Sequence, residues 1–346
     1  MLETVLASYG IDIKQVFVKA HGSGLINNTW RISNDPGDLI LQRINQQVFR
    51  IPENIADNIR LIGAYLNVHA PNYTFVSPIK TTTGDEMVIA GGDYYRLFPY
   101  VADSHTIDTV QTPDQAYEAS RQFGLFTRHL SAFPVSELKT TIPDFHNLSY
   151  RFRQFEEACK KGNPERIVLA EDIIKYIRKA TQILSIFENI PRDPDFRLRV
   201  THHDTKISNV LFNKSDKGIC VIDLDTVMPG YFISDVGDMM RTYLSSVSEE
   251  ESDFDKIDIR EDFFKAIYEG YMSEMSGELS LTEAGHFIYA GKFMIYMQAV
   301  RFLTDFLNND IYYGAFYELH NYVRAGNQVS LLKKLIEKED KLKTYS

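Results

Sequence analysis

The chain reads His202-His203-Asp204-Thr205-Lys206-Ile207-Ser208-Asn209 at the point that decides its fold. A histidine is followed two residues later by an aspartate, and an asparagine comes five residues after that aspartate. This H-x-D-x-x-x-x-N spacing is typical of a loop in which the aspartate receives or orients the proton of an attacking hydroxyl and the asparagine binds Mg²⁺. By itself the octapeptide fits equally well a turn capped by Asp204, with His202 packed in the core.

A second candidate metal ligand, Asp223, lies 19 residues after Asp204 and ends the apolar run 219–222. A metal site of this kind suits phosphoryl transfer, because the transferred group carries dispersed negative charge that must be neutralised. Asp225 competes for the same role, since it lies on the same strand face as Asp223. The position at the end of the strand favours Asp223.

The residues around this segment predict two kinds of structure. Up to about residue 98, short runs separated by Gly, Asn and Asp predict strands, interrupted by one helix that opens at Pro52. The expected strands are 16–20, 29–33, 39–43, 74–79, 87–90 and 94–97. After residue 105 the period becomes helical, apart from a hairpin at 209–213 and 218–224. The expected helices are 113–131, 150–161, 170–186, 259–273 and 282–308. We therefore expect an α+β protein with a small β-rich lobe followed by a larger helical lobe.

Composition limits the partners and the compartment. The 346-residue chain has a net charge of -10, which disfavours nucleic acid as a partner because such proteins concentrate Lys and Arg. Its two cysteines, Cys159 and Cys220, form no metal or redox motif and suit a reducing compartment. An acidic start and the lack of a long apolar run predict a cytoplasmic protein that does not bind membranes.

A glycine pair supplies a candidate phosphate loop. Gly22-Ser23-Gly24 lies between two expected strands, where glycines let backbone amides approach the phosphates of ATP. Asn27 stands where a third glycine is usual in protein kinases. The same residues also fit a simple turn. The alternative P-loop motif does not occur, because Gly291-Lys292 is followed by Phe293.

Together these motifs resemble the aminoglycoside phosphotransferase and choline kinase family. The resemblance rests on residues 204–209, on Ile222-Asp223 and on Ser234-Asp235-Val236-Gly237-Asp238. Longer stretches are similar to bacterial N-acetylhexosamine 1-kinases. These stretches are Thr201-His202-His203-Asp204-Thr205-Lys206-Ile207-Ser208-Asn209-Val210-Leu211, Val221-Ile222-Asp223-Leu224-Asp225-Thr226-Val227-Met228-Pro229-Gly230 and Val300-Arg301-Phe302-Leu303-Thr304-Asp305.

The resemblance implies a protein-kinase-like fold of two lobes that uses ATP and Mg²⁺. It implies a nucleotide-binding lobe at 1–97, a hinge at 98–103 and a catalytic, substrate-binding lobe at 104–346. In the hinge, the backbone of Phe98 and Tyr100 would pair with the adenine.

The resemblance also implies roles for single residues. Asp204 would be the catalytic base and contact the substrate, while Asn209 and Asp223 would hold the metal. Gly22, Ser23, Gly24 and Asn27 would bind the nucleotide. Asp235 and Asp238 would brace the catalytic loop through hydrogen bonds.

A basic residue on the third strand would grip the ATP phosphates. Arg43 is the basic candidate, and Gln42 is the alternative on the opposite strand face. Glu53 could pair with Arg43, although a carboxylate at a helix start is more often a cap.

For the acceptor, the resemblance points to Arg301 and Tyr312 as sugar contacts, although tyrosines at helical spacing are usually core. We expect phosphorylation of a small hydroxylated metabolite, an amino sugar, at the anomeric hydroxyl of N-acetylglucosamine or N-acetylgalactosamine. A kinase for choline, homoserine or an aminoglycoside, and a nucleotide-binding pseudokinase that regulates a partner, are the alternatives.

Overall fold

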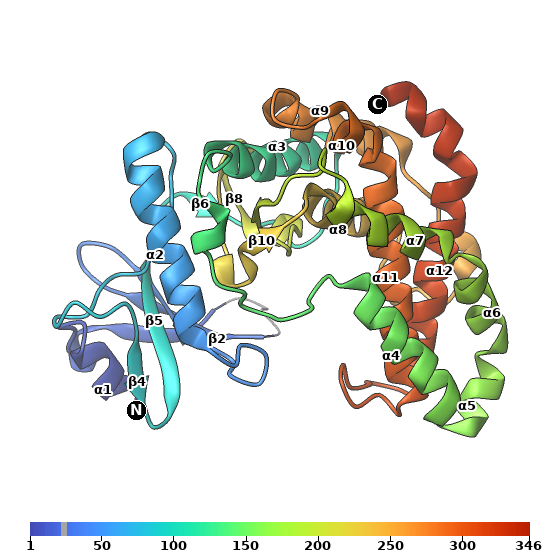
Figure 1. Cartoon of the computed structure of the whole chain (residues 1–346). Helices are drawn as coiled ribbons and strands as arrows, with labels where there is room; N and C mark the ends of the chain where they lie inside the picture. The colour runs from blue at the N-terminus through green and yellow to red at the C-terminus, as the bar shows by residue number, and fades with distance from the viewer. Residues whose placement is uncertain (22–25) are drawn as a thin grey trace. The chain divides into compact units, whose positions relative to one another are not determined.

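The computed structural model describes residues 1–21 and 26–346. The chain forms two compact units (Figure 1). The first contains Met1–Thr106, His129–Pro143 and Asn209–Pro229, and the second contains Ile107–Arg128, Asp144–Ser208 and Gly230–Ser346. The first unit thus extends beyond the expected lobe 1–97 and takes in two later segments.

A five-stranded antiparallel sheet forms the centre of the first unit (Figure 1). Its strands are β1 (Phe17–Ala20), β2 (Asn28–Ser33), β3 (Leu39–Arg43), β4 (Val88–Ala90) and β5 (Asp93–Pro99), in the order β1-β2-β3-β5-β4. The register of β3 and β5 sets Gln42 opposite Arg96 and Arg43 opposite Tyr95. Because side chains alternate along a strand, Gln42 and Arg96 share one face of the sheet, and Arg43 lies on the other.

Apolar residues of this sheet pack against the N-terminal helix α1 (Leu2–Ala7). The core of this part consists of Val5, Leu6, Ile32, Leu41, Val88, Tyr95 and Leu97. Helix α2 (Pro52–His69) begins with proline at its first turn and buries Ile55, Ile59, Ile62 and Leu66, the apolar face that the spacing predicts.

A buried asparagine on α2 joins the three segments of the first unit. The Asn58 side-chain amide donates to the carbonyls of Lys139 and Val227 at 2.8 and 2.9 Å. Its Oδ1 accepts a hydrogen bond from the Lys139 amide at 2.8 Å. The Nδ2 and Oδ1 atoms of the buried Asn58 side chain are therefore both bonded to backbone groups that lie far from it in sequence.

A second, three-stranded sheet completes the first unit, with strand order β6-β8-β9. Its strands are β6 (Ser104–His105), β8 (Val210–Asn213) and β9 (Gly218–Val221). The strands β8 and β9 form the hairpin that the sequence predicts. Two more short strands are β7 (Arg199–Thr201) and β10 (Met228–Gly230).

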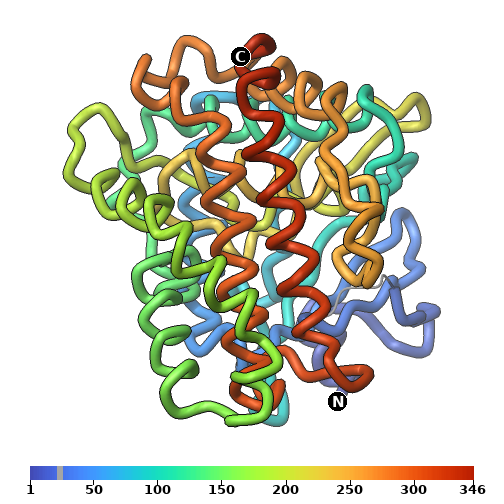
Figure 2. Tube along the Cα trace, turned by 90° about the vertical axis from the view of Figure 1, so that its right-hand side faces the viewer, coloured from blue at the N-terminus to red at the C-terminus, as the bar shows by residue number. Residues whose placement is uncertain are grey.

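Helices make up most of the second unit. They are α3 (Pro113–His129), α4 (Leu148–Lys161), α5 (Pro164–Leu169), α6 (Glu171–Lys179), α7 (Gln182–Asn189), α8 (Phe232–Tyr243), α9 (Glu261–Met275), α10 (Leu281–Gly285), α11 (Phe287–Leu307) and α12 (His320–Leu342). Helix α11 is buried along almost its whole length and packs against α12, α8 and α4. Figure 2 shows α11 and α12, in orange and red, running side by side. A helix that is apolar all round fits such a central position.

Three sequence-based expectations were wrong in detail. The run 74–79 forms no strand and makes only an isolated bridge between Ile79 and Leu97; Pro78, which has no amide hydrogen, precedes that bridge. The expected helix 170–186 is divided into α6 and α7, and the helix 282–308 into α10 and α11. No helix in the described ranges combines the length and apolarity required to cross a membrane.

Candidate active site

The loop that contains Asp204 is held by helix α8. The two carboxylate oxygens of Asp235 accept hydrogen bonds from the amides of His202 and His203, at 3.0 and 2.7 Å. His203 has a left-handed backbone with φ of 65°, which a non-glycine residue adopts only where its surroundings hold it there. Asp235 supplies part of that restraint.

The residue after Asp204 is fixed from the same helix. The Thr205 amide donates to the Asp238 carboxylate at 2.8 Å, and the Thr205 hydroxyl donates to the Asp235 carbonyl at 2.8 Å. The Tyr243 hydroxyl donates to the Thr205 carbonyl at 2.7 Å. The prediction that Asp235 and Asp238 brace the loop is confirmed. Asp204 therefore lies between two residues whose backbones are anchored.

Two buried carboxyl groups, Asp235 and Asp238, lie behind this loop. Burial raises the pKa of the Asp235 carboxyl to about 7, against the opposing effect of the two amides that it binds. Burial also raises the pKa of Asp238, while Arg241, which pairs with it at 3.0 Å, acts in the other direction. The Asp204 side chain is 22% exposed and pairs with the Lys206 ammonium at 3.2 Å. Of the three carboxylates, Asp204 is the one that solvent reaches.

The two histidines of the motif are both buried. The His202 ring packs edge-on against Phe123, with 5.1 Å between ring centroids, so the alternative that places His202 in the core is correct for this residue. The His203 ring lies so close to Gly230 that a Cβ atom there would be 2.6 Å from its Nε2. These contacts give the histidines a packing role beside the loop.

The predicted metal ligands, Asn209 and Asp223, belong to the first unit. The Asn209 carbonyl accepts a hydrogen bond from the Ile222 amide at 2.9 Å, which ties the start of β8 to the residue before Asp223. Asp223 has a left-handed backbone, with φ of 60° and ψ of 61°. An amide oxygen and a carboxylate suit Mg²⁺, which is usually held by one or two protein ligands together with phosphate oxygens and water. No cluster of three or more His, Cys, Asp or Glu side chains suited to a metal occurs in the described ranges.

Asp225, the competitor of Asp223, is engaged elsewhere. It forms an ion pair with Arg96 at 2.5 Å, and these side chains are 2% and 3% exposed. The Arg96 guanidinium also donates to the Gln42 Oε1 at 2.8 and 3.1 Å. On the other side, the Asn27 Nδ2 donates to Asp225 at 2.7 Å. Arg96 was missed by sequence reasoning, although an arginine inside the apolar run Tyr94–Phe98 was a signal that could have revealed it.

Arg43 lies on the other face of the sheet from this network. Its guanidinium binds Asp93 at 3.2 Å and the Asn28 Oδ1 at 2.6 Å, and its side chain is 41% exposed. Glu53 accepts a hydrogen bond from the Tyr94 hydroxyl at 2.6 Å and forms no ion pair with Arg43. The structure thus groups Gln42 and Arg96 with Asp225, and leaves Arg43 apart from them.

The remaining nucleotide-binding predictions are only partly described. Gly22, Ser23 and Gly24 lie outside the described residues. Asn27, in addition to its bond to Asp225, accepts a hydrogen bond from the Asn45 amide at 3.0 Å. In the expected hinge, Phe98 pairs with Ile40 in the sheet, and the Tyr100 amide donates to the Asp38 carbonyl at 2.9 Å.

The predicted acceptor contacts lie in the second unit. Arg301 of α11 donates to the Gln298 side chain at 3.2 Å, and Tyr312 is 66% exposed in the loop that follows this helix. The backbone amides of Tyr312 and Tyr313 donate to the buried Asp305 carboxylate at 2.7 and 2.9 Å, which fixes the loop.

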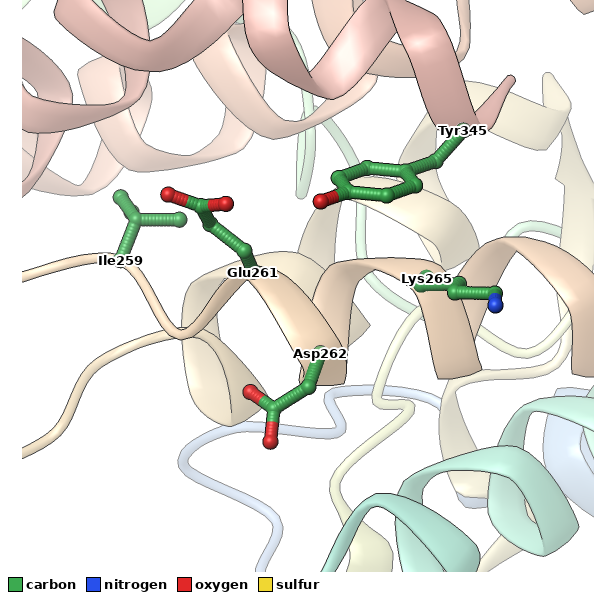
Figure 3. Close-up of a pocket in the computed structure, with 5 residues that line it drawn as sticks. All are labelled: Ile259, Glu261, Asp262, Lys265 and Tyr345. Atoms are coloured by element: carbon green, nitrogen blue, oxygen red, sulfur yellow. The ribbon is translucent and has the colours of Figure 1, made fainter.

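A hollow of about 530 Å³ is lined by Ile259, Glu261, Asp262, Lys265 and Tyr345 (Figure 3). Glu261 already pairs with Lys341 at 2.6 Å. The hollow contains none of the predicted site residues, so we do not assign it to the reaction.

Comparison with known proteins decides the family. A model of the phosphotransferase enzyme family matches residues 18–268. The chain belongs to this family. The predicted relationship is thereby confirmed at the level of this phosphotransferase family.

Solved structures agree with this phosphotransferase in fold. A microcompartment-associated aminopropanol kinase has a TM-score of 0.68 at 14% identity, covering 99% of this chain and 97% of its own. An aminoglycoside phosphotransferase from Alicyclobacillus acidocaldarius has a TM-score of 0.64 at 14% identity, with 98% and 96% covered. A choline/ethanolamine kinase family protein from Mesorhizobium loti has a TM-score of 0.61 at 17% identity, with 98% and 94% covered. The predicted fold, an antiparallel sheet lobe with a helical lobe, is confirmed.

Proposed function

We propose that this phosphotransferase transfers the γ-phosphoryl group of ATP to the anomeric hydroxyl of N-acetylglucosamine or N-acetylgalactosamine, in the cytoplasm. The observation that carries the proposal is the loop held by α8, in which Asp204 lies between the anchored residues His203 and Thr205. An anchored but accessible carboxylate can receive a proton at a fixed position, which favours catalysis through orientation. Use of ATP is supported by a solved structure of similar fold, a spectinomycin phosphotransferase in complex with ADP and spectinomycin.

Each candidate residue then has a distinct role. Asp204 accepts the proton of the attacking hydroxyl. Asn209 and Asp223 hold Mg²⁺, which neutralises charge on the ATP phosphates when it is bound. Arg43 is the predicted phosphate contact on the third strand, and Gln42, on the face that also carries Arg96, is the alternative. The segment 22–27 and the backbone at Phe98 and Tyr100 complete the nucleotide site.

The choice of the anomeric position rests on chemistry and on the similarity around Asp204, Asp223 and Arg301. An anomeric hydroxyl is more acidic than other sugar hydroxyls, because the ring oxygen withdraws electron density, so its proton is better matched to a carboxylate base. Arg301 and Tyr312 offer hydrogen-bond donors for the acetamido group. A site built on such bonds discriminates against sugars that leave its polar groups unpaired.

The test compares each free sugar with its 1-O-methyl glycoside, which blocks the anomeric oxygen and keeps every other group. We expect ATP- and Mg²⁺-dependent formation of the 1-phosphate, with the glycoside turned over at less than about a hundredth of the rate. Asp204→Asn is the control, and we expect it to lower turnover by about 10²- to 10⁴-fold while ATP still binds. Comparable phosphorylation of the glycoside would refute the anomeric assignment.

The same assay addresses the alternatives. Phosphorylation of choline, homoserine or an aminoglycoside in place of the sugars would reassign the acceptor. ATP binding without turnover on any acceptor would identify a pseudokinase.

A further inference from the structure

The loop 308–319, between α11 and α12, combines an anchored backbone with an apolar surface. Its side chains Ile311, Tyr312 and Phe316 are all exposed. Asp310 has a left-handed backbone with φ of 61°, which a non-glycine residue keeps only where its surroundings hold it. A loop that presents apolar side chains from a fixed backbone is typical of a ligand contact, and Tyr312 is the predicted acceptor contact.

Asn321, at the start of α12, fixes this loop from the interior of the second unit. Its buried side chain donates through Nδ2 to the Asp310 carboxylate and to the Gly314 carbonyl, each at 2.9 Å. The same nitrogen donates at 3.2 Å to Asp305, the carboxylate that also binds two amides of the loop. The Asn321 Oδ1 has a partner outside the loop, since it accepts a hydrogen bond from Arg324 Nη1 at 3.2 Å.

A chain of ion pairs continues from Arg324 to the catalytic loop. Arg324 Nη2 donates to Glu249 Oε1 at 2.5 Å. The other carboxylate oxygen of Glu249 accepts from Arg241 Nη1 at 3.0 Å. Arg241 in turn pairs through Nη2 with Asp238 Oδ1 at 3.0 Å. The remaining oxygen of Asp238 accepts from the Thr205 amide at 2.8 Å, and Thr205 directly follows the candidate base.

Each member of this chain uses different atoms for its two neighbours, so all of the bonds can form at the same time. Every member belongs to the second unit. The side chains of Arg241 and Arg324 are 15% and 14% exposed, so solvent screens their charges only in part. Glu249 joins the two arginines, and in the described ranges Arg324 forms no ion pair with another carboxylate.

The segment 248–251, which carries Glu249, is held on one face of α12. Asn327 Nδ2 donates to two carbonyls of this segment, at 3.0 and 3.2 Å. His320 Nε2, seven residues earlier on the same face, lies 3.2 Å from the Glu250 carboxylate. The position of the Glu249 carboxylate is therefore set by α12, the helix that also fixes the 308–319 loop.

We infer that Glu249 is a positioning residue that couples the 308–319 loop to the catalytic loop, so that the loop in contact with the acceptor also sets the position of Asp204. This inference rests on the proposed function for the base and for the acceptor contact, but not for the identity of the acceptor. In Glu249→Gln the two arginines would face a neutral amide, and their repulsion would displace Arg241. A base displaced by about 1 Å loses on the order of 100-fold in rate.

The experiment measures kcat and both Michaelis constants of Glu249→Gln with ATP and N-acetylglucosamine. We expect kcat to fall about 10- to 100-fold, while the KM for ATP changes by less than about 2-fold, because the chain contains none of the predicted nucleotide contacts. The matched control is Glu250→Gln in the same segment, whose carboxylate pairs with His320 instead of Arg241. Its kcat should stay within about 2-fold of the wild type, because the pair is partly exposed and ends at His320.

A second variant distinguishes positioning from folding. Arg324→Gln breaks the chain on the side of the loop and leaves Glu249 paired with Arg241. We expect it to lower kcat and to raise the KM for the acceptor, with kcat expressed per nucleotide-binding site so that unfolded protein does not count. The double variant Glu249→Gln/Arg324→Gln should be within about 2-fold of Glu249→Gln in kcat/KM for the acceptor, because both changes interrupt one chain.

The outcomes separate this inference from the proposed function. A wild-type kcat in Glu249→Gln, or losses that multiply in the double variant, would overturn the inference and leave the phosphotransferase reaction intact. If Glu249→Gln does not fold, an unchanged kcat in Arg324→Gln overturns it as well. Use of choline in place of sugars would change only the proposed acceptor, and the same losses measured with choline would support the coupling. Full turnover by Asp204→Asn would overturn both, because no base would remain to be positioned.

Discussion

The ion pair of Arg96 with Asp225 is almost fully buried, whereas that of Arg43 with Asp93 is open to solvent. Replacing Arg96 with Met leaves the Asp225 carboxylate buried without its counter-charge. We expect this change to lower the free energy of unfolding by about 3–5 kcal/mol, measured by chemical denaturation. Arg43→Gln is the control on the other face of the sheet, and its effect should be within about 1 kcal/mol because exposed pairs are weak.

A double variant tests the pairing itself. Arg96→Met combined with Asp225→Asn should be less destabilised than the sum of the two single changes, because neither charge remains buried alone. Additive effects of the two substitutions, within about 0.5 kcal/mol, would show that the residues do not stabilise each other.

The site could be predicted from sequence only where its residues form a motif. The bracing roles of Asp235 and Asp238 follow from such a motif and are confirmed, whereas the catalytic and metal roles of Asp204, Asn209 and Asp223 stay predictions. Arg96 belongs to no motif, and its partner is 129 residues away in the chain. A period of two along a strand identifies the face of a residue but not the residue that it meets there.

Helices α8 and α11 approach closely because each has a glycine at the contact. A Cβ atom on Gly237 would lie 2.4 Å from the Ala290 carbonyl oxygen, while one on Gly291 would lie 2.6 Å from the Met240 sulfur. The Ala290 carbonyl cannot move without the rest of α11, whereas the Met240 thioether can rotate away. Gly237→Ala should therefore displace α8, and with it the braces of the catalytic loop.

We expect Gly237→Ala to destabilise the protein by about 1–3 kcal/mol and to lower kcat, as measured by thermal unfolding and single-turnover assays. Gly291→Ala is the matched control at the same contact and should have the smaller effect on both. Equal effects of the two substitutions would mean that α8 does not depend on this close approach.

Among the secondary-structure elements, predictions from hydrophobic periodicity were most reliable for helices and strands that bury one face. The apolar face of α2 and most strands of the first sheet were predicted. Helix α8 was not predicted, because a helix that contains Ser234, Asp235 and Gly237 has weak helical propensity and is stabilised by packing instead. The missing strand at 74–79 shows the converse, since an apolar run forms a strand only when a neighbour can pair with it.

The first unit is assembled from three separate parts of the chain. A fragment of residues 1–106 would lose both backbone partners of Asn58 and the carboxylate partner of Arg96. We expect this fragment to show no cooperative thermal transition in circular dichroism and to bind a hydrophobic dye, whereas the full chain unfolds cooperatively. A cooperative transition in the isolated fragment would show that the two later segments are dispensable for folding.

For the whole molecule, the predicted fold class is confirmed, whereas the predicted acceptor, an amino sugar, stays a prediction. The fold class could be predicted because the hydrophobic periods of strands and helices, and one loop motif, are all local in the chain. The contacts of an acceptor depend instead on which side chains distant segments of the chain bring together, and no local pattern encodes that.

Asn58 also constrains how this chain can change over evolutionary time. Its three hydrogen-bond partners are the carbonyls of Lys139 and Val227, which every amino acid supplies, and the Lys139 amide, which every amino acid except proline supplies. A second mutation at either position therefore cannot restore a bond that a change of Asn58 has broken. Descendants of this sequence are consequently expected to keep asparagine at position 58 while the exposed side chain at position 139 varies; the side chain of Val227 is constrained separately, because it is buried in the core.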